Sequence, residues 1–97
     1  MSLRTYTIER ELTLPDGRQG RIRLGLAQDS YIDKKDQDTV VLELRIGDHV
    51  VAALNTVLAP EQEDEGAMLV REIVAGLEEG RLEPTAEALD QYAERRP

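Results

Sequence analysis

Hydrophobic and polar residues alternate in residues 3–14, 18–28 and 39–47, as they do in half-buried β-strands. From residue 60 the apolar residues instead recur every three or four positions, which predicts helices over residues 60–80 and 84–95. A further apolar stretch, residues 49–58, completes a set of four predicted strands. The sequence therefore predicts one α+β domain spanning residues 1–97. It is a four-stranded antiparallel meander in order 1-2-3-4, followed by two helices packed on one face.

The first two strands are joined by a turn with a clear chemical signature, Leu14-Pro15-Asp16-Gly17-Arg18. Proline presets the first turn position, and glycine accepts the left-handed conformation that closes a three-residue hairpin loop. This turn fixes the register of the two strands. The register predicts apolar pairs on one face and opposite charges on the other: Ile8 with Leu24, Tyr6 with Leu26, Glu9 with Arg23, and Glu11 with Arg21.

Residues 39–58 form the most apolar part of the chain. The stretch 39–47 has one apolar face, and Gly47-Asp48 suits a two-residue turn with glycine first. The stretch 49–58 is apolar on both faces, so its register is left open. It also fits a helix, with a stripe formed by Val50, Leu54, Val57 and Leu58. Its β-branched residues, the turn before it and Pro60 after it favour a strand.

The helical part begins with Pro60, which suits the first position of a helix, and is followed by several acidic residues that complement the positive end of the helix dipole. Gly80 is predicted to end this helix. Its inward stripe is predicted to be Ala67, Val70, Ile73, Val74 and Leu77, with Met68 off the stripe. The second helix is predicted to face inward through Leu89, Tyr92 and Ala93.

Charge divides the chain into two unlike halves. The 97 residues carry a formal charge of –8: residues 1–48 hold 8 basic and 9 acidic side chains, whereas residues 49–97 hold 4 and 11. An acidic helical surface can steer a basic partner, although a solvated helix exterior is the simpler interpretation. The negative charge disfavours nucleic acid and anionic membranes. A nucleic-acid surface built from Arg4, Arg18, Arg21 and Arg23 is therefore the least favoured interpretation.

Residues able to carry chemistry are few. The chain has no cysteine and one histidine, His49, so a zinc site of the usual kind is not expected. The lack of cysteine also fits a reducing compartment, so we expect a cytoplasmic location. A Ser30–His49 catalytic pair has no support in the pattern. The aspartates of residues 29–38 lack calcium-loop spacing and predict a solvated loop, although a cation there is left open. We expect no catalytic residue, no metal and no cofactor, and a protein that is not an enzyme.

Arg10 is the residue that departs from its pattern, since it interrupts the apolar face of the first strand. Its side chain is expected to extend to the edge of the sheet. The alternative is an anion site in a pocket between sheet and helices. The candidate ligand-pocket residues are Arg10, Tyr6, His49 and Tyr92.

A last strand that is apolar on both faces leaves an exposed edge, which a symmetric dimer would cover. The candidate interface residues are Val50, Val51, Leu54, Val57 and Met68. The favoured function is a small homodimeric module that binds a macromolecule, with a basic protein as the expected partner. The alternative function is a small-ligand-binding protein or enzyme that uses the pocket near Arg10 and His49.

Overall fold

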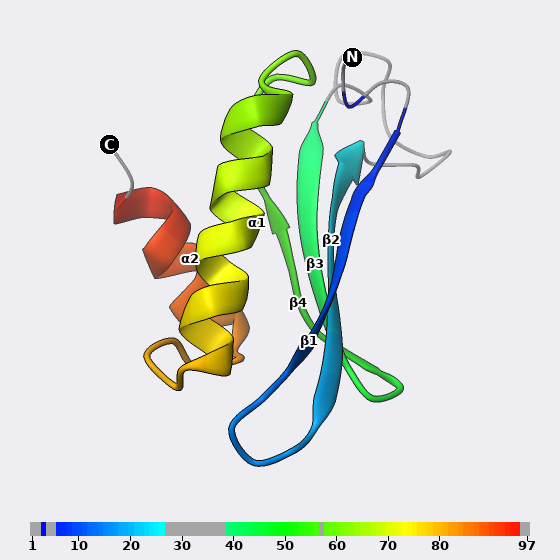
Figure 1. Ribbon diagram of the computed structural model, residues 1–97. Coiled ribbons are helices and arrows are strands. Elements are labelled where there is room, and N and C mark those ends of the chain that lie inside the picture. The colour runs from blue at the N-terminus through cyan, green and yellow to red at the C-terminus, as the bar shows by residue number, and fades with distance from the viewer. Residues whose placement is uncertain (1–2, 4–5, 27–38, 57, 96–97) are drawn as a thin grey trace.

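The chain folds into a twisted sheet covered on one side by two helices (Figure 1). The computed structural model describes residues 3, 6–26, 39–56 and 58–95. The sheet has the order β1-β2-β3-β4, with antiparallel neighbours. This confirms the predicted α+β meander. The elements are β1 (Ile8–Thr13), β2 (Gln19–Leu26), β3 (Val40–Ile46), β4 (His49–Asn55), α1 (Glu63–Glu78) and α2 (Ala86–Arg95).

The β1–β2 hairpin has the register that its turn predicts. Gly17 adopts a φ of 92°, and the backbones of Leu14 and Arg18 are joined by a hydrogen bond of 2.8 Å. Ile8 pairs with Leu24, and the two predicted Glu–Arg pairs lie directly opposite each other. The predicted pair of Tyr6 with Leu26 is not part of the β1–β2 register, because β1 begins only at Ile8 and Tyr6 precedes it. The strand is thus shorter than the predicted range 3–14.

The β3–β4 hairpin settles the type and register of the stretch that the pattern left open. β4 is a strand, so the helical alternative is wrong. Gly47 has a φ of 61°, and no described non-glycine residue has a positive φ, which fits a two-residue turn with glycine first. The pairing shifts between Leu44 and Arg45, and this irregularity places two β4 residues opposite one on β3. The strand ends at Asn55 rather than at residue 58.

Helix α1 begins three residues later than predicted. Pro60 belongs to a turn in which the Gln62 N–H donates to the Ala59 carbonyl at 3.0 Å, so proline occupies the second position of that turn. The prediction that Pro60 is the first helical residue is therefore wrong. The acidic first turn is confirmed, with Glu63 as the first helical residue. Gly80 ends the helix with a φ of 78°.

The face that α1 buries is rotated slightly from the predicted stripe, because it includes two glycines. Gly66 lies against Leu24 of β2, and Gly76 lies against Leu82 after the helix. The absence of a side chain at these positions lets the helix approach closely. The buried residues of α1 are Gly66, Leu69, Val70, Ile73, Gly76 and Leu77.

The two helices divide the inner face of the sheet between them. Helix α1 packs on β1 and β2, while α2 packs on β4. Thr85 caps α2, since its hydroxyl accepts a hydrogen bond from the Ala88 N–H at 3.2 Å. Leu89 is fully buried and Tyr92 is partly buried, as predicted. Among the described residues, no helix is long and apolar enough to cross a membrane.

Candidate functional site

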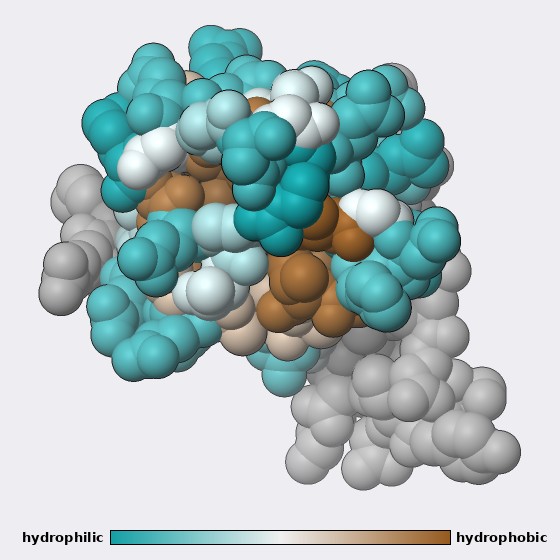
Figure 2. Space-filling model, turned by 90° about the horizontal axis from the view of Figure 1, so that it is seen from below, coloured by the Kyte–Doolittle hydropathy of each residue, from teal (hydrophilic) through white to brown (hydrophobic). Residues whose placement is uncertain are grey.

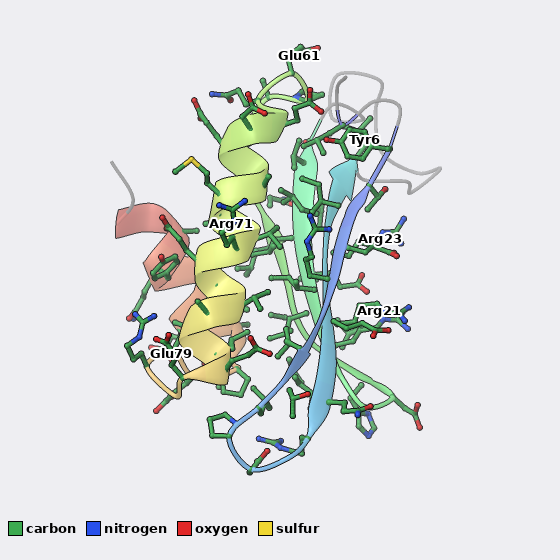
Figure 3. All side chains as sticks on the ribbon, viewed as in Figure 1. Tyr6, Arg21, Arg23, Glu61, Arg71 and Glu79 are labelled. Atoms are coloured by element: carbon green, nitrogen blue, oxygen red, sulfur yellow. The ribbon has the colours of Figure 1, made fainter. Side chains whose placement is uncertain are left out.

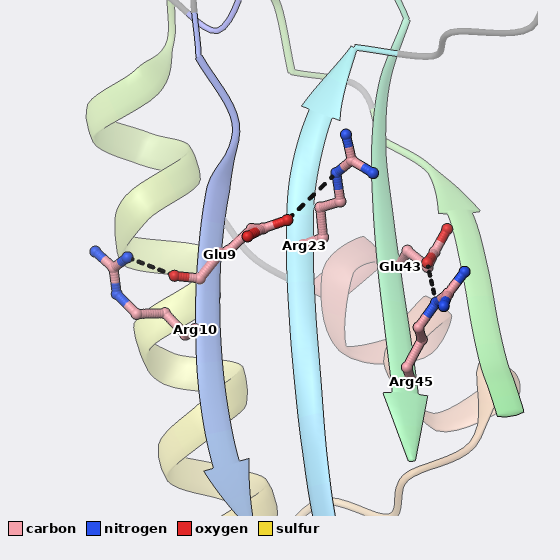
Figure 4. A network of polar contacts seen from close by, with 5 residues as sticks. All are labelled: Glu9, Arg10, Arg23, Glu43 and Arg45. Carbon is pink, nitrogen blue, oxygen red and sulfur yellow. Dashed lines mark hydrogen bonds and ion pairs between the residues drawn. The ribbon is translucent and has the colours of Figure 1, made fainter. Parts of the chain in front are cut away.

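The outer face of the sheet carries charges that neutralise one another (Figure 4). Arg21 donates to Glu11 at 3.0 Å, and Arg45 donates to Glu43 at 2.9 Å. Arg23 lies 3.9 Å from Glu9. Except for the half-buried Glu43, these side chains are solvent-exposed, so each pair contributes at most about 1 kcal/mol to stability. Their main consequence is a sheet face with equal numbers of positive and negative groups.

Arg10 lies at the free edge of β1, as predicted. Its backbone pairs with Ile22, but its exposed guanidinium donates to the Glu9 carbonyl at 2.7 Å (Figure 4). At the lower end of the same edge, the Thr13 N–H donates to the Glu78 carboxylate of α1 at 3.3 Å. Two backbone groups that could pair with another strand are therefore bonded to side chains of this chain.

The candidate ligand-pocket residues lie apart in the structure. Arg10 is on β1 and His49 on β4, which are opposite edges of the sheet. The Tyr92 hydroxyl on α2 donates to Glu72 of α1 at 2.8 Å. Tyr6 precedes β1 and contacts the start of α1. The anion site near these residues stays a prediction.

The Tyr6–Glu63 pair joins the segment that precedes β1 to the first turn of α1. The Tyr6 hydroxyl donates to the Glu63 carboxylate at 2.5 Å. This hydrogen bond lowers the pKa of Glu63 and raises the pKa of Tyr6 above its usual value of 10.0. The pair therefore favours the folded state in the pH range where Glu63 is ionised and Tyr6 is protonated.

We expect the stabilising effect of Tyr6 to depend on pH at both ends of the range. The pKa of Glu63 is lowered in the folded state, so its contribution to stability is lost as the pH falls into the acid range. The pKa of Tyr6 is raised in the folded state, so its contribution to stability is lost as the pH rises into strong alkali. The difference in unfolding free energy between wild type and Tyr6→Phe, measured by urea denaturation, should be largest near neutral pH. A difference that does not change with pH would contradict this assignment.

A depression of about 470 Å³ lies at the end of the sheet that carries the two hairpin turns. Figure 2 looks onto this end and shows hydrophobic side chains reaching the surface at its centre, surrounded by hydrophilic ones. Its volume is in the range of small-molecule sites, but such sites are usually lined mainly by apolar groups. The lining here instead includes acidic, basic and glycine residues. Its members are Glu11, Leu12, Thr13, Gln19, Gly20, Arg21, Arg45, Gly47, Asp48 and Glu78.

The sequence pattern did not indicate this depression. Gly20 is one of its lining residues, and a Cβ there would lie 2.7 Å from the Ile46 side chain and 2.9 Å from the Arg45 carbonyl. A single glycine in an alternating strand is the weak signal that could have marked a close backbone approach.

The surface of the two helices is strongly acidic. Between residues 61 and 93, nine acidic side chains are exposed, whereas the exposed basic ones are Arg71 and Arg81. Glu65, Glu72 and Glu79 are spaced by seven residues, so they follow one side of α1 and form what we call the acidic stripe. Figure 3 shows Glu61 and Glu79 at opposite ends of α1, and Arg21 and Arg23 across the sheet from it.

The candidate dimer residues do not form one surface. Val50 is opposite Arg45 on the outer face and is 49% exposed, while Met68 is 51% exposed on α1, across the sheet. Leu54 pairs with Leu42, so it faces the helices and is half-buried. Val51 is also half-buried, and Val57 lies outside the described residues. The homodimer stays a prediction.

Neither known proteins nor a metal cluster among the described residues assigns a site to this chain. No protein-family model, characterised protein or solved structure matches this chain. Within the described residues, no group of three or more His, Cys, Asp or Glu side chains could hold a metal ion. The predicted solvated loop and its possible cation fall on residues 29–38, outside the described part.

Proposed function

We propose that this chain is a small non-enzymatic, homodimeric binding module of the cytoplasm, and that its helical surface receives a basic segment of a protein partner. The separation of charge between the two sides of the sheet carries this proposal. The outer sheet face is balanced by its Glu–Arg pairs, whereas exposed acids dominate α1 and α2. A field of one sign over one side of a molecule steers an oppositely charged partner to that side.

The exposed position of the acidic groups supports recognition of a macromolecule. Rim charges in solvent raise the association rate and select partners by sign, but they add little affinity individually. A partner with several basic residues could contact the acidic stripe and its neighbours on α2 together. Binding of this kind weakens as salt screens the charges.

Charge reversal on the acidic stripe should abolish retention of a basic partner. The double variant Glu65→Lys/Glu79→Lys is suited to this test because Glu65 is in the first turn of α1 and Glu79 is its C-cap. The unfavourable and favourable effects on the helix dipole then largely offset each other. We expect this variant to lose binding to a short oligolysine peptide, measured by calorimetric titration at low salt.

The matched control is Glu9→Lys/Glu11→Lys on the outer sheet face, which changes the net charge by the same amount. Circular dichroism should show both variants folded. The control should keep most of the oligolysine binding, with some loss from the less negative net charge. Equal losses in the two variants would mean that net charge rather than the helical surface governs binding, and no binding by wild type would refute the proposal.

The alternative function, a small-ligand-binding protein or enzyme, would use the depression at the hairpin end. The observation that favours it is the presence of Arg21 and Arg45 in the lining, since arginine recognises carboxylate and phosphate. Both guanidinium groups already bind carboxylates of this chain. A rise in melting temperature with an added anionic small molecule, lost in Arg45→Ala, would support this alternative.

A further inference from the structure

The outer edge of β4 offers backbone hydrogen-bonding groups to another strand. The Thr56 N–H donates to the Val40 carbonyl at 2.9 Å, and Leu42 pairs with Leu54. Backbone groups alternate in direction along a strand, so those of Ala53 and Asn55 point away from β3. Among the described residues, none is hydrogen-bonded to these outward groups.

On the opposite edge of the sheet, two outward backbone groups are already bonded to side chains of this chain. On β1, Arg10 covers the Glu9 carbonyl, and Glu78 accepts the hydrogen bond of the Thr13 N–H. Charged side chains at an edge are a common means of preventing strand addition. A sheet with one open edge and one protected edge can pair once, which gives a closed dimer rather than a filament.

The absence of charge on β4 favours a second copy over a basic peptide at the open edge. The chain carries –8, so two copies repel each other over most of their surfaces. Residues 49–55, which form β4, contain no Asp, Glu, Lys or Arg. A basic peptide would gain no ion pair from these residues, whereas an identical strand would bring no new charge to them.

We infer that β4 pairs antiparallel with β4 of a second copy about a two-fold axis at Leu54. Ala53 of each copy then lies opposite Asn55 of the other, and each such pair exchanges both backbone hydrogen bonds. Leu54 meets its counterpart on the helix side, where it is half-buried in the single chain. This arrangement specifies the self-association that is part of the proposed function, and it rests on that proposal.

The register shift near Val50 limits the length of the pairing. An irregularity of this kind bends the strand, so regular pairing extends only over the second half of β4. A short pairing between two copies of like charge should be weak and should strengthen with salt as the repulsion is screened. Binding of a basic partner should respond to salt in the opposite direction.

The experiment is sedimentation equilibrium at tens of micromolar on wild type and three variants. Asn55→Pro removes an outward N–H without removing a bond to β3, and its matched control Asn55→Ala keeps that N–H. Val50→Lys places a charge on the outer face outside the paired segment. We expect wild type, Asn55→Ala and Val50→Lys to dimerise, and Asn55→Pro to raise the dissociation constant by at least about tenfold, since each copy loses a hydrogen bond.

A monomeric wild type would overturn the inference, as would a dimer that survives in Asn55→Pro and is lost in Val50→Lys. If Asn55→Pro does not fold, amide hydrogen exchange on wild type decides the question. Exchange at Ala53 and Asn55 should slow as the protein concentration rises, and concentration-independent exchange there would also overturn the inference.

These outcomes are separable from those of the proposed function. A monomer that still binds oligolysine would refute the strand pairing and the homodimer but keep the acidic binding surface. A β4-paired dimer that binds no oligolysine would keep the strand pairing and refute the basic partner.

Discussion

Replacing Leu24 with alanine should destabilise the protein by about 3 kcal/mol, within the range of about 2–5 kcal/mol for buried leucines. Leu24 is fully buried in β2, and its Cδ2 lies 2.7 Å from the position that a Cβ on Gly66 would occupy. It therefore joins the sheet to α1, the helix that carries the acidic stripe. The melting temperature measured by calorimetry should fall by roughly 12–24 °C for a domain of this size.

A second substitution makes this prediction specific to the helix–sheet contact. In wild type, Gly66→Ala brings a methyl group against Leu24, which offsets the gain of about 1 kcal/mol in helix propensity. In the Leu24→Ala background the obstacle is gone, so Gly66→Ala should stabilise the protein. Equal effects of Gly66→Ala in the two backgrounds would show that the two residues are not in contact. Met68→Ala is the surface control, expected to change stability by less than about 0.5 kcal/mol.

Gly20→Ala should destabilise the sheet by about 1–3 kcal/mol, as overpacking of a well-packed site does. The added methyl would lie 2.9 Å from the Arg45 carbonyl, which is backbone and cannot move without disturbing the β2–β3 pairing. Chemical denaturation should show a lower midpoint.

The comparison variant is Gly25→Ala in the same strand. There the obstacle is the Thr7 side chain, which precedes β1 and can shift more readily. We expect a smaller loss of stability for Gly25→Ala than for Gly20→Ala. The reverse order would mean that the contact of Gly20 with the β3 backbone is not what constrains the strand.

The sequence was most informative where local chemistry and cross-strand pattern agree. The Pro15-Asp16-Gly17 turn determined the first hairpin and, with it, the two Glu–Arg pairs on the outer face. In the folded turn the Arg18 backbone N–H donates to Asp16 at 3.0 Å and lowers the pKa of that carboxylate. The same local strength explains why the register could be predicted without any tertiary information.

The sequence was less informative where tertiary contacts decide between local options. Pro60 suits both a helix start and a turn, and the Gln62–Ala59 hydrogen bond selects the turn. Periodicity could not place the β4 irregularity, because Val50 and Val51 are both apolar. The link between Tyr6 and Glu63 joins residues 57 positions apart, and no local pattern marks it.

The candidate site also has one part that the sequence predicts and one part that depends on tertiary structure. The acidic character of the helical half can be read from composition, but its separation from a balanced sheet face depends on the register of β1, β2 and β3. Residue type alone predicts that Arg10, Tyr6, His49 and Tyr92 lie near one pocket. Topology sets Arg10 and His49 at opposite edges of the sheet.

The most direct test of the acidic helical surface as a binding site is an amide chemical-shift titration of the isotope-labelled chain with a short oligolysine peptide. We predict that the shifts change along α1 and α2, around Glu65, Glu72 and Glu79, and that the changes diminish as salt is added. Shift changes centred on Glu9, Glu11 and Glu43 of the outer sheet face, or no shift changes at low salt, would contradict binding at the acidic helical surface.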